Sequence, residues 1–311
     1  YMAVRRPDGY VGKPPELGTS VFVPTLGNGS ATIPSLPSTF PVDFCLYKDF
    51  VDSTANWATT ARLTGGGYMQ TNTTNAEAST NEHAWDSMVG CHAGTWLNSN
   101  DIGYLWKRHA GFDVVTFVGN EVSGRQIPHS LNKVPEMMWV KNRSSANKPW
   151  NVYHKGLNGG SNPQGYYIEL DNNQAEDTSN TRWNSTAPTS THFTLGNSSL
   201  INTDGENLIA MLFASVDGIS KVGYYTGTGG TRTITTGFQP RFLIYKKTSS
   251  TQDWFVLDTT RGWGSGDDKY LELNNTNDQD DFNFGAPTST GFTLEDYNNT
   301  NGATYIYYAH A

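Results

Sequence analysis

The stretch Phe44-Cys45-Leu46-Tyr47-Lys48-Asp49 decides the fold, because an apolar run that ends in lysine occurs twice more in the chain. The other copies read Met137-Met138-Trp139-Val140-Lys141-Asn142 and Phe242-Leu243-Ile244-Tyr245-Lys246-Lys247. Eight or nine residues after the first lysine of each copy stands a tryptophan: Trp57, Trp150 or Trp254. An internal repeat of about 100 residues indicates one structural unit copied in tandem.

The repeat extends beyond these two features. A basic residue and a Gly-rich loop follow each tryptophan, and a strand-like stretch comes next: Tyr68-Met69-Gln70-Thr71, Tyr167-Ile168-Glu169-Leu170 or Tyr270-Leu271-Glu272-Leu273. Its alternating character is typical of a half-buried strand. Each copy ends in an apolar stretch, over residues 104–110, 208–214 and 305–311, that we predict to be a closing strand.

These copies predict the domain organisation. We expect one repeat in residues 17–110, which is the most divergent, a second in 111–217 and a third in 218–311. Residues 1–7 resemble the closing stretch, so residues 1–16 are interpreted as the end of an upstream repeat plus a linker. We therefore expect the chain to be a fragment of a longer polypeptide.

The composition favours β-structure. Aromatic residues make up 13% of the chain, charged residues only 16%, and there are 32 glycines, which suits short strands joined by polar turns. We predict an all-β fold of three tandem antiparallel β-sandwich modules of a jelly-roll or lectin-like kind. A propeller is the alternative, although its blades take only about 40 to 50 residues. A second alternative is that two adjacent copies pair into one larger sandwich.

Charge and hydropathy exclude some partners. The net charge of −8 and pI near 5.3 argue against nucleic acid, because phosphate binding needs clustered Lys and Arg. The longest apolar runs are far shorter than the roughly 20 residues needed to cross a bilayer, so we expect a soluble protein without membrane insertion. Cys45 takes the place of Met138 and Leu243 and is interpreted as a core residue, with a disulfide to Cys91 as the alternative.

The sequence lacks the usual signatures of a catalytic or metal site. It has no nucleophile elbow, zinc-protease helix motif or phosphate-binding loop, and its seven histidines are not paired at metal-binding spacing. We predict no enzyme activity, no metal and no cofactor. The oxygen-rich segments at Asp267-Asp268 and over residues 274–281 leave bound Ca²⁺ as an alternative.

Tryptophans that break the repeat are the better functional clue. Trp57, Trp150 and Trp254 recur in register and are predicted to fill the core. Trp263 stands in a Gly-rich loop where the other copies have leucine, and Trp96 lies in an unmatched insert. Exposed aromatic faces beside polar side chains hold sugar rings. The candidate glycan contacts are therefore Trp263, Arg261, Asp267, Asp268 and Trp96. The alternative for Trp263 is that it fills a larger gap.

Several phrases resemble a known group of proteins. They are Gly237-Phe238-Gln239-Pro240-Arg241-Phe242-Leu243-Ile244, Asp253-Trp254-Phe255-Val256-Leu257-Asp258, Ala187-Pro188-Thr189-Ser190-Thr191 and Tyr305-Ile306-Tyr307-Tyr308-Ala309. They resemble the repeated modules of tail fibre and related adhesion proteins of tailed bacteriophages, especially those of marine phages. The resemblance implies an extracellular virion component at the tail, commonly a homotrimer, that contacts the host surface and other tail proteins.

From the repeat, the unmatched aromatic residues and this resemblance we expect a non-enzymatic receptor-binding segment that recognises bacterial surface polysaccharide. Two alternatives stay open. One is a purely structural fibre or decoration module. The other is a polysaccharide depolymerase that uses paired acids such as Asp267 and Asp268.

Overall fold

Three six-stranded antiparallel sheets dominate the computed structural model, which describes residues 17–108 and 111–311. In these residues the helices are five 3₁₀ segments of three or four residues. The predicted all-β, sandwich-type fold is therefore confirmed. The predicted end of an upstream repeat, residues 1–16, lies outside the described residues. None of the helices in the described part of the chain has the length and apolar character needed to span a membrane.

The three large sheets have the same strand order, so each copy of the repeated sequence folds in the same way. The first sheet runs β1 (Phe22–Leu26), β8 (Asp101–Trp106), β3 (Phe44–Asp49), β4 (Ala58–Ala61), β5 (Gly67–Met69) and β6 (Ala78–Ser79). The second runs β9 (Phe112–Val118), β16 (Asn207–Phe213), β11 (Met137–Asn142), β12 (Asn151–His154), β13 (Tyr166–Glu169) and β14 (Asp177–Thr178). The third runs β17 (Ser220–Thr226), β25 (Thr304–His310), β19 (Phe242–Lys247), β20 (Phe255–Asp258), β21 (Asp268–Glu272) and β22 (Asp280–Phe282).

A much smaller sheet covers the outer face of each large one. These small sheets are β2 (Leu36–Pro37) with β7 (Gly90–Cys91), β10 (Arg125–Pro128) with β15 (His192–Leu195), and β18 (Arg232–Thr235) with β24 (Gly291–Leu294) and β23 (Pro287–Thr288). Each closes a separate core against the outward residues of its large sheet. The second layer of each sandwich thus has two or three strands, fewer than in a jelly roll, and loops complete it.

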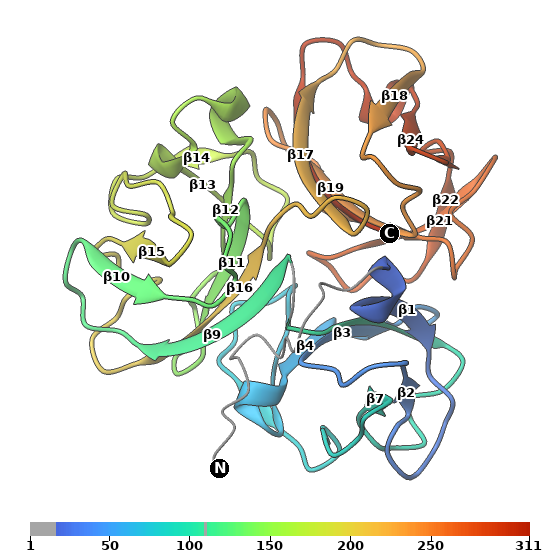
Figure 1. The fold of residues 1–311 in the computed structure, drawn as a ribbon, viewed down its shortest axis with the longest axis horizontal. Helices are drawn as coiled ribbons and strands as arrows, with labels where there is room; N and C mark the ends of the chain where they lie inside the picture. Colours follow the sequence, from blue (N-terminus) through green and yellow to red (C-terminus); the bar gives the residue numbers. More distant parts are fainter. Residues whose placement is uncertain (1–16, 109–110) are drawn as a thin grey trace, which may run out of the picture.

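The inner faces of the large sheets pack together around one common centre, as the three lobes of Figure 1 show. Side chains alternate along a strand, so Phe44 and Leu46 of β3 point inward and Cys45 points outward. Equivalent inward residues of all three sheets belong to a single buried cluster. The copies therefore form a compact three-lobed unit.

The recurring tryptophans have equivalent surroundings. Trp57, Trp150 and Trp254 are each at most 1% exposed. Their indole N–H groups donate to backbone carbonyls of another copy: to Glu272 at 2.7 Å, Gln70 at 2.8 Å and Glu169 at 2.8 Å, respectively. The acceptors occupy the same place in the repeat, at or just after the end of β21, β5 and β13. The predicted core role of these tryptophans is confirmed, and each one also joins two copies.

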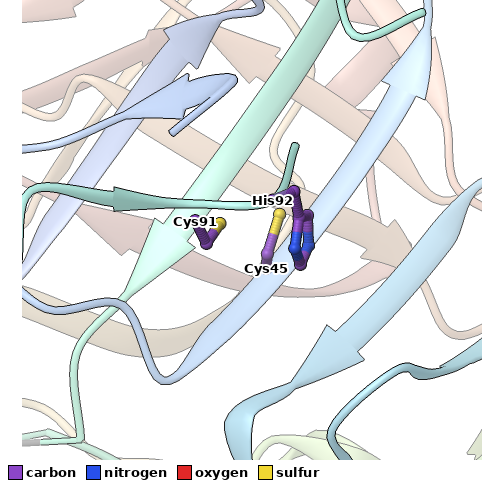
Figure 2. A group of neighbouring side chains, drawn as sticks. All are labelled: Cys45, Cys91 and His92. Atoms are coloured by element: carbon purple, nitrogen blue, oxygen red, sulfur yellow. The ribbon is translucent and has the colours of Figure 1, made fainter. Parts of the chain in front are cut away.

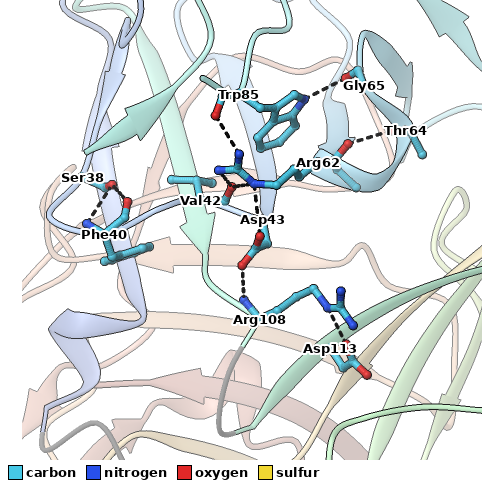
Figure 3. A network of polar contacts seen from close by, with 11 residues as sticks. Ser38, Phe40, Val42, Asp43, Arg62, Thr64, Gly65, Trp85, Arg108 and Asp113 are labelled. Carbon is cyan, nitrogen blue, oxygen red and sulfur yellow. Dashed lines mark hydrogen bonds and ion pairs between the residues drawn. The ribbon is translucent and has the colours of Figure 1, made fainter. Parts of the chain in front are cut away.

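The position directly after the fourth strand of each large sheet carries a basic residue in the first two copies and Thr259 in the third. Arg62 pairs with Asp43 at 3.2 Å (Figure 3), and Lys155 pairs with Glu136 at 2.6 Å. In the third copy Arg241 replaces the acid, and Thr259 donates its backbone N–H to Arg241 O as Arg62 does to Asp43 O. A second cation at that place would repel Arg241.

Candidate functional site

Three surface hollows lie at corresponding places, one beside the fifth strand of each large sheet. Their volumes are about 400, 340 and 350 Å³ in the first, second and third copy. Each is lined by a half-buried tyrosine and by the residue two positions later: Tyr68 and Gln70, Tyr167 and Glu169, Tyr270 and Glu272. We call them the first, second and third hollow.

Aromatic side chains wall the first hollow. Ring centroids of Tyr47 and Trp96 are 5.6 Å apart, and the His83 ring meets Tyr68 edge-on at 5.2 Å and Tyr47 edge-on at 5.8 Å. Trp57 and Ala58 also line it. Polar side chains complete the lining: Asn56, Gln70, Thr80 and Glu82. A concavity with apolar walls and a few polar groups is the usual form of a small-ligand site.

The aromatic wall of the first hollow is uncharged at neutral pH. Burial, with a smaller contribution from neighbouring His92, lowers the pKa of His83 to about 3. The His83 Nδ1–H donates to Gly66 O at 3.4 Å, so Nε2 accepts the Tyr47 hydroxyl at 2.8 Å. Burial also raises the pKa of Tyr47. This hydrogen-bonded pair holds the wall in one arrangement.

The second and third hollows are more acidic. Tyr167 donates its hydroxyl to Asp177 at 3.4 Å, and Tyr270 donates to Asp280 at 3.3 Å, at matching places in the repeat. The Arg182 guanidinium lies 4.3 Å from the centroid of the Tyr167 ring and covers one of its faces. These hollows therefore offer carboxylates for hydroxyl groups but less aromatic surface than the first.

The prediction that Trp263 presents an exposed ring is wrong. Its side chain is 3% exposed within the core of the third copy, and its indole N–H donates to Gly285 O at 2.8 Å. In the first copy the corresponding bond runs the other way, from Trp85 to Gly65 O (Figure 3). Phe284 replaces that tryptophan in the third copy, and Trp263 fills the space from the opposite loop. The gap-filling alternative fits this structure.

The side chains of Arg261 and Asp268, two of the predicted contacts, also bond to other groups within the protein. The Arg261 side chain is 1% exposed and pairs with Asp258 at 2.6 Å. Asp268 is fully buried and accepts the backbone N–H groups of Gly264 and Phe284 at 2.9 Å each. The expectation that these side chains face a sugar is therefore wrong, and Asp268 is not free to act with Asp267 as a catalytic pair. Asp267 is exposed, without a neighbouring aromatic face at Trp263.

Trp96 is the predicted contact that does line a hollow. It is half-buried and joins the aromatic wall of the first hollow. Its companions Tyr47, Tyr68 and His83 escaped the sequence analysis, because they read as ordinary strand and loop residues. The signal that could have found one of them is the tyrosine repeated at positions 68, 167 and 270.

A second cluster lies behind this wall and was also missed. Cys45, Cys91 and His92 are fully buried, and their sulfur and ring nitrogen atoms all lie within 4.8 Å of one another (Figure 2). Burial raises the pKa of the Cys45 thiol. Burial acts in the same sense on Cys91, but the contacts with Cys45 and His92 outweigh it and lower its pKa to about 6. Both cysteines are free thiols, so the disulfide alternative is not formed in this structure.

The segment over residues 274–281 gives no comparable cluster. Asp280 accepts the Tyr270 hydroxyl, Asp281 pairs with Lys269, and Asn275 and Asn277 donate to Glu272. In residues 17–108 and 111–311 the metal-ligating side chains that come close enough to share an ion are those of the Cys45 cluster. The oxygen groups of this loop bond mainly to their own neighbours.

The fold and the hollows together define an all-β protein built from repeated sheets, with a surface concavity beside each of them. The chain belongs to the family described as Domain of unknown function (DUF7483), which matches residues 106–311. The matched segment contains the second and third large sheets and begins at the last residue of β8. A comparison with curated proteins finds no match.

Proposed function

We propose that the chain is a non-enzymatic receptor-binding segment of a phage tail fibre that attaches the virion to bacterial surface polysaccharide. The observation that carries this proposal is the first hollow, where Trp96, Tyr47 and Tyr68 surround a concavity of about 400 Å³. The C–H face of a sugar ring packs on aromatic rings, while its hydroxyl groups bind polar side chains such as Gln70 and Glu82.

The repetition of the hollows adds to the proposal. Polysaccharides repeat, and three sites on one rigid body can engage several units of the same strand. Even weak sites then gain affinity, because binding at one raises the effective concentration at the next. Assembly into a homotrimer, as the resemblance to tail fibres implies, would multiply this effect.

Two other functions compete with the proposal. A purely structural fibre or decoration module would have no use for a concave aromatic surface. A depolymerase would need two available carboxylates at a suitable separation, and the predicted acid Asp268 is buried and bonded to backbone N–H groups. The first hollow favours binding over either alternative.

Glycan-array binding and adsorption to host cells test the proposal. We expect Trp96→Ala to weaken glycan binding roughly tenfold, because truncating an aromatic anchor costs more than ~1 kcal/mol. Tyr224→Ala is the matched control, since Tyr224 is 46% exposed on β17 and does not line the first hollow. Binding of no bacterial glycan by the folded wild type, or equal binding by Trp96→Ala, would count against the proposal.

A further inference from the structure

The outer core of the first copy differs from the other two in a correlated way. On the third strand of the large sheet, Cys45 stands where the others have Met138 and Leu243. On the small sheet, the strand pairings Leu36 with Cys91, Ile127 with Phe193 and Ile234 with Phe292 put Cys91 at the place of a phenylalanine. Two apolar side chains that belong to the same outer core in each of the other copies are thus both replaced by thiols.

An imidazole occupies the space that the smaller side chains leave. His92 is fully buried, and its backbone lies in the left-handed region with φ 60°. That conformation is uncommon for a residue other than glycine. A simple disulfide between the two cysteines would have no need of a third, buried donor.

The hydrogen bonds of His92 put it in the state that binds a metal. A carbonyl oxygen only accepts, so the 3.4 Å contact with Ala84 O means that Nδ1 carries the proton. Nε2 is then unprotonated and accepts the Thr60 hydroxyl at 2.9 Å, a bond that a metal on Nε2 would replace while the hydroxyl turns to Cys45 O at 3.4 Å. Histidines that bind metals usually donate the other ring N–H to a carbonyl or carboxylate in this way.

The small sheet of the first copy has shorter strand pairing than the small sheets of the other two copies. The small sheet has two paired residues per strand, β2 with β7, where the corresponding ladders of the other copies have four. Residues 80–100 otherwise run as loop and carry both His83 and Trp96 of the first hollow. A cross-link from Cys91 and His92 to Cys45 would tie this loop to β3 of the large sheet.

We propose that Cys45, Cys91 and His92 form a structural zinc site that anchors the wall of the first hollow. Two thiolates and an imidazole are typical zinc ligands, with bonds of ~2.3 Å to sulfur and ~2.0 Å to nitrogen. Atoms already within 4.8 Å of one another need only a small contraction to share one ion. Two thiolates neutralise Zn²⁺, which suits a fully buried position, and the buried Thr60 hydroxyl, 2.9 Å from a His92 ring nitrogen, is an oxygen available as a fourth ligand.

The test is metal analysis of the full chain. The protein is unfolded and refolded with Zn²⁺ under reducing conditions and then dialysed extensively, and its zinc content is measured by elemental mass spectrometry. We expect one zinc per chain, and a lower melting temperature after refolding with a chelator. Refolding with Co²⁺ alone should give visible d–d bands and thiolate-to-cobalt charge-transfer bands in the absorption spectrum. This measurement uses the wild-type protein and needs no variant.

Variants assign the ligands. Cys91→Ala and His92→Ala should lose the zinc, whereas His83→Gln should keep it, because His83 touches the cluster but is not part of the ligand set. Wild-type protein that retains no zinc and gives no cobalt charge transfer would overturn the proposal. So would protein isolated without reductant whose intact mass lacks two hydrogens, since the sulfurs would then form a disulfide. None of these readouts depends on glycan binding.

Discussion

Single side chains form hydrogen bonds between the copies. Trp57, Trp150 and Trp254 form equivalent ones. Beside its indole contact, each has its backbone N–H bonded to a side-chain oxygen after the fifth strand: Asn72, Asp171 and Asn274, at 3.1, 2.6 and 2.8 Å. Phenylalanine could fill much of the same volume but would remove the indole donor from the carbonyl of another copy.

The first prediction concerns this hydrogen bond. Trp150→Phe should lower the free energy of unfolding by about 1–3 kcal/mol, because the Gln70 carbonyl loses its 2.8 Å donor and keeps only the 3.4 Å contact with the Thr73 N–H. Urea denaturation measures the change, and Trp57→Phe and Trp254→Phe should lose similar amounts. Tyr224→Phe, at an exposed position, is the control. Three clearly unequal losses would contradict the equivalence of the three sites.

A buried ion pair of the third copy is linked to the first copy through the Tyr104 hydroxyl. Arg261 and Asp258 are 1% and 0% exposed, and the Tyr104 hydroxyl donates to Asp258 at 2.7 Å. Removing one partner leaves a buried charge uncompensated, so Asp258→Asn should destabilise the protein by about 3–5 kcal/mol. Asp281→Asn, at the exposed pair with Lys269, should cost less than about 1 kcal/mol. Comparable losses for the two variants in chemical denaturation would refute this reading.

At the scale of the strands, β3, β11 and β19 each direct a lysine into the end of the shared core. Lys48, Lys141 and Lys246 are fully buried and donate to backbone carbonyls. Burial lowers their pKa from the usual 10.5 to about 8, 8 and 7, respectively. The carbonyl contacts orient these ammonium groups without fully replacing the water that they lose.

These lysines predict how stability depends on pH. Between about pH 7 and 10.5 the unfolded chain binds more protons at these sites than the folded chain, so they make stability rise with pH over that window. Lys141→Met should flatten the rise between pH 8 and 10 in melting experiments, whereas Lys133→Met, on an exposed loop, should leave it unchanged. An unaltered slope in Lys141→Met would show that this ammonium is not destabilised by burial.

At the scale of the whole molecule, the copies share one core. Because the inner faces of all three large sheets form a single cluster, no copy can unfold without exposing the apolar faces of the others. Calorimetry should therefore give one transition whose calorimetric and van't Hoff enthalpies agree. Two or three separable transitions would mean that the lobes are energetically independent.

The sequence was sufficient for the strands but not for their surroundings. The alternating stretches that begin at Tyr68, Tyr167 and Tyr270 predicted strands where β5, β13 and β21 lie, because a period-two pattern is a local property of the chain. In the third copy, Phe284 replaces a tryptophan in one loop, and Trp263 fills the vacated space from another loop. An extra tryptophan in one loop and a missing one in another were both visible in the sequence, but only their contact shows that they compensate.

The candidate site was predictable only in part, for a related reason. Trp96 stood out because it breaks the repeat, whereas Tyr47 and Tyr68 follow the strand pattern that hides them. His92 and Cys91 are neighbours in sequence, but Cys45 comes from another strand, so their convergence depends on how the small sheet packs on the large one. Such tertiary contacts have no signature in local spacing.

The most direct measurement of the central claim is a crystal structure of the chain with an oligosaccharide selected on the glycan array. We predict a sugar ring in the first hollow, packed on Trp96 or Tyr68, with its hydroxyl groups bonded to Gln70, Glu82 or Asn56. A sugar bound only outside the three hollows, or none at saturating concentration, would contradict the account.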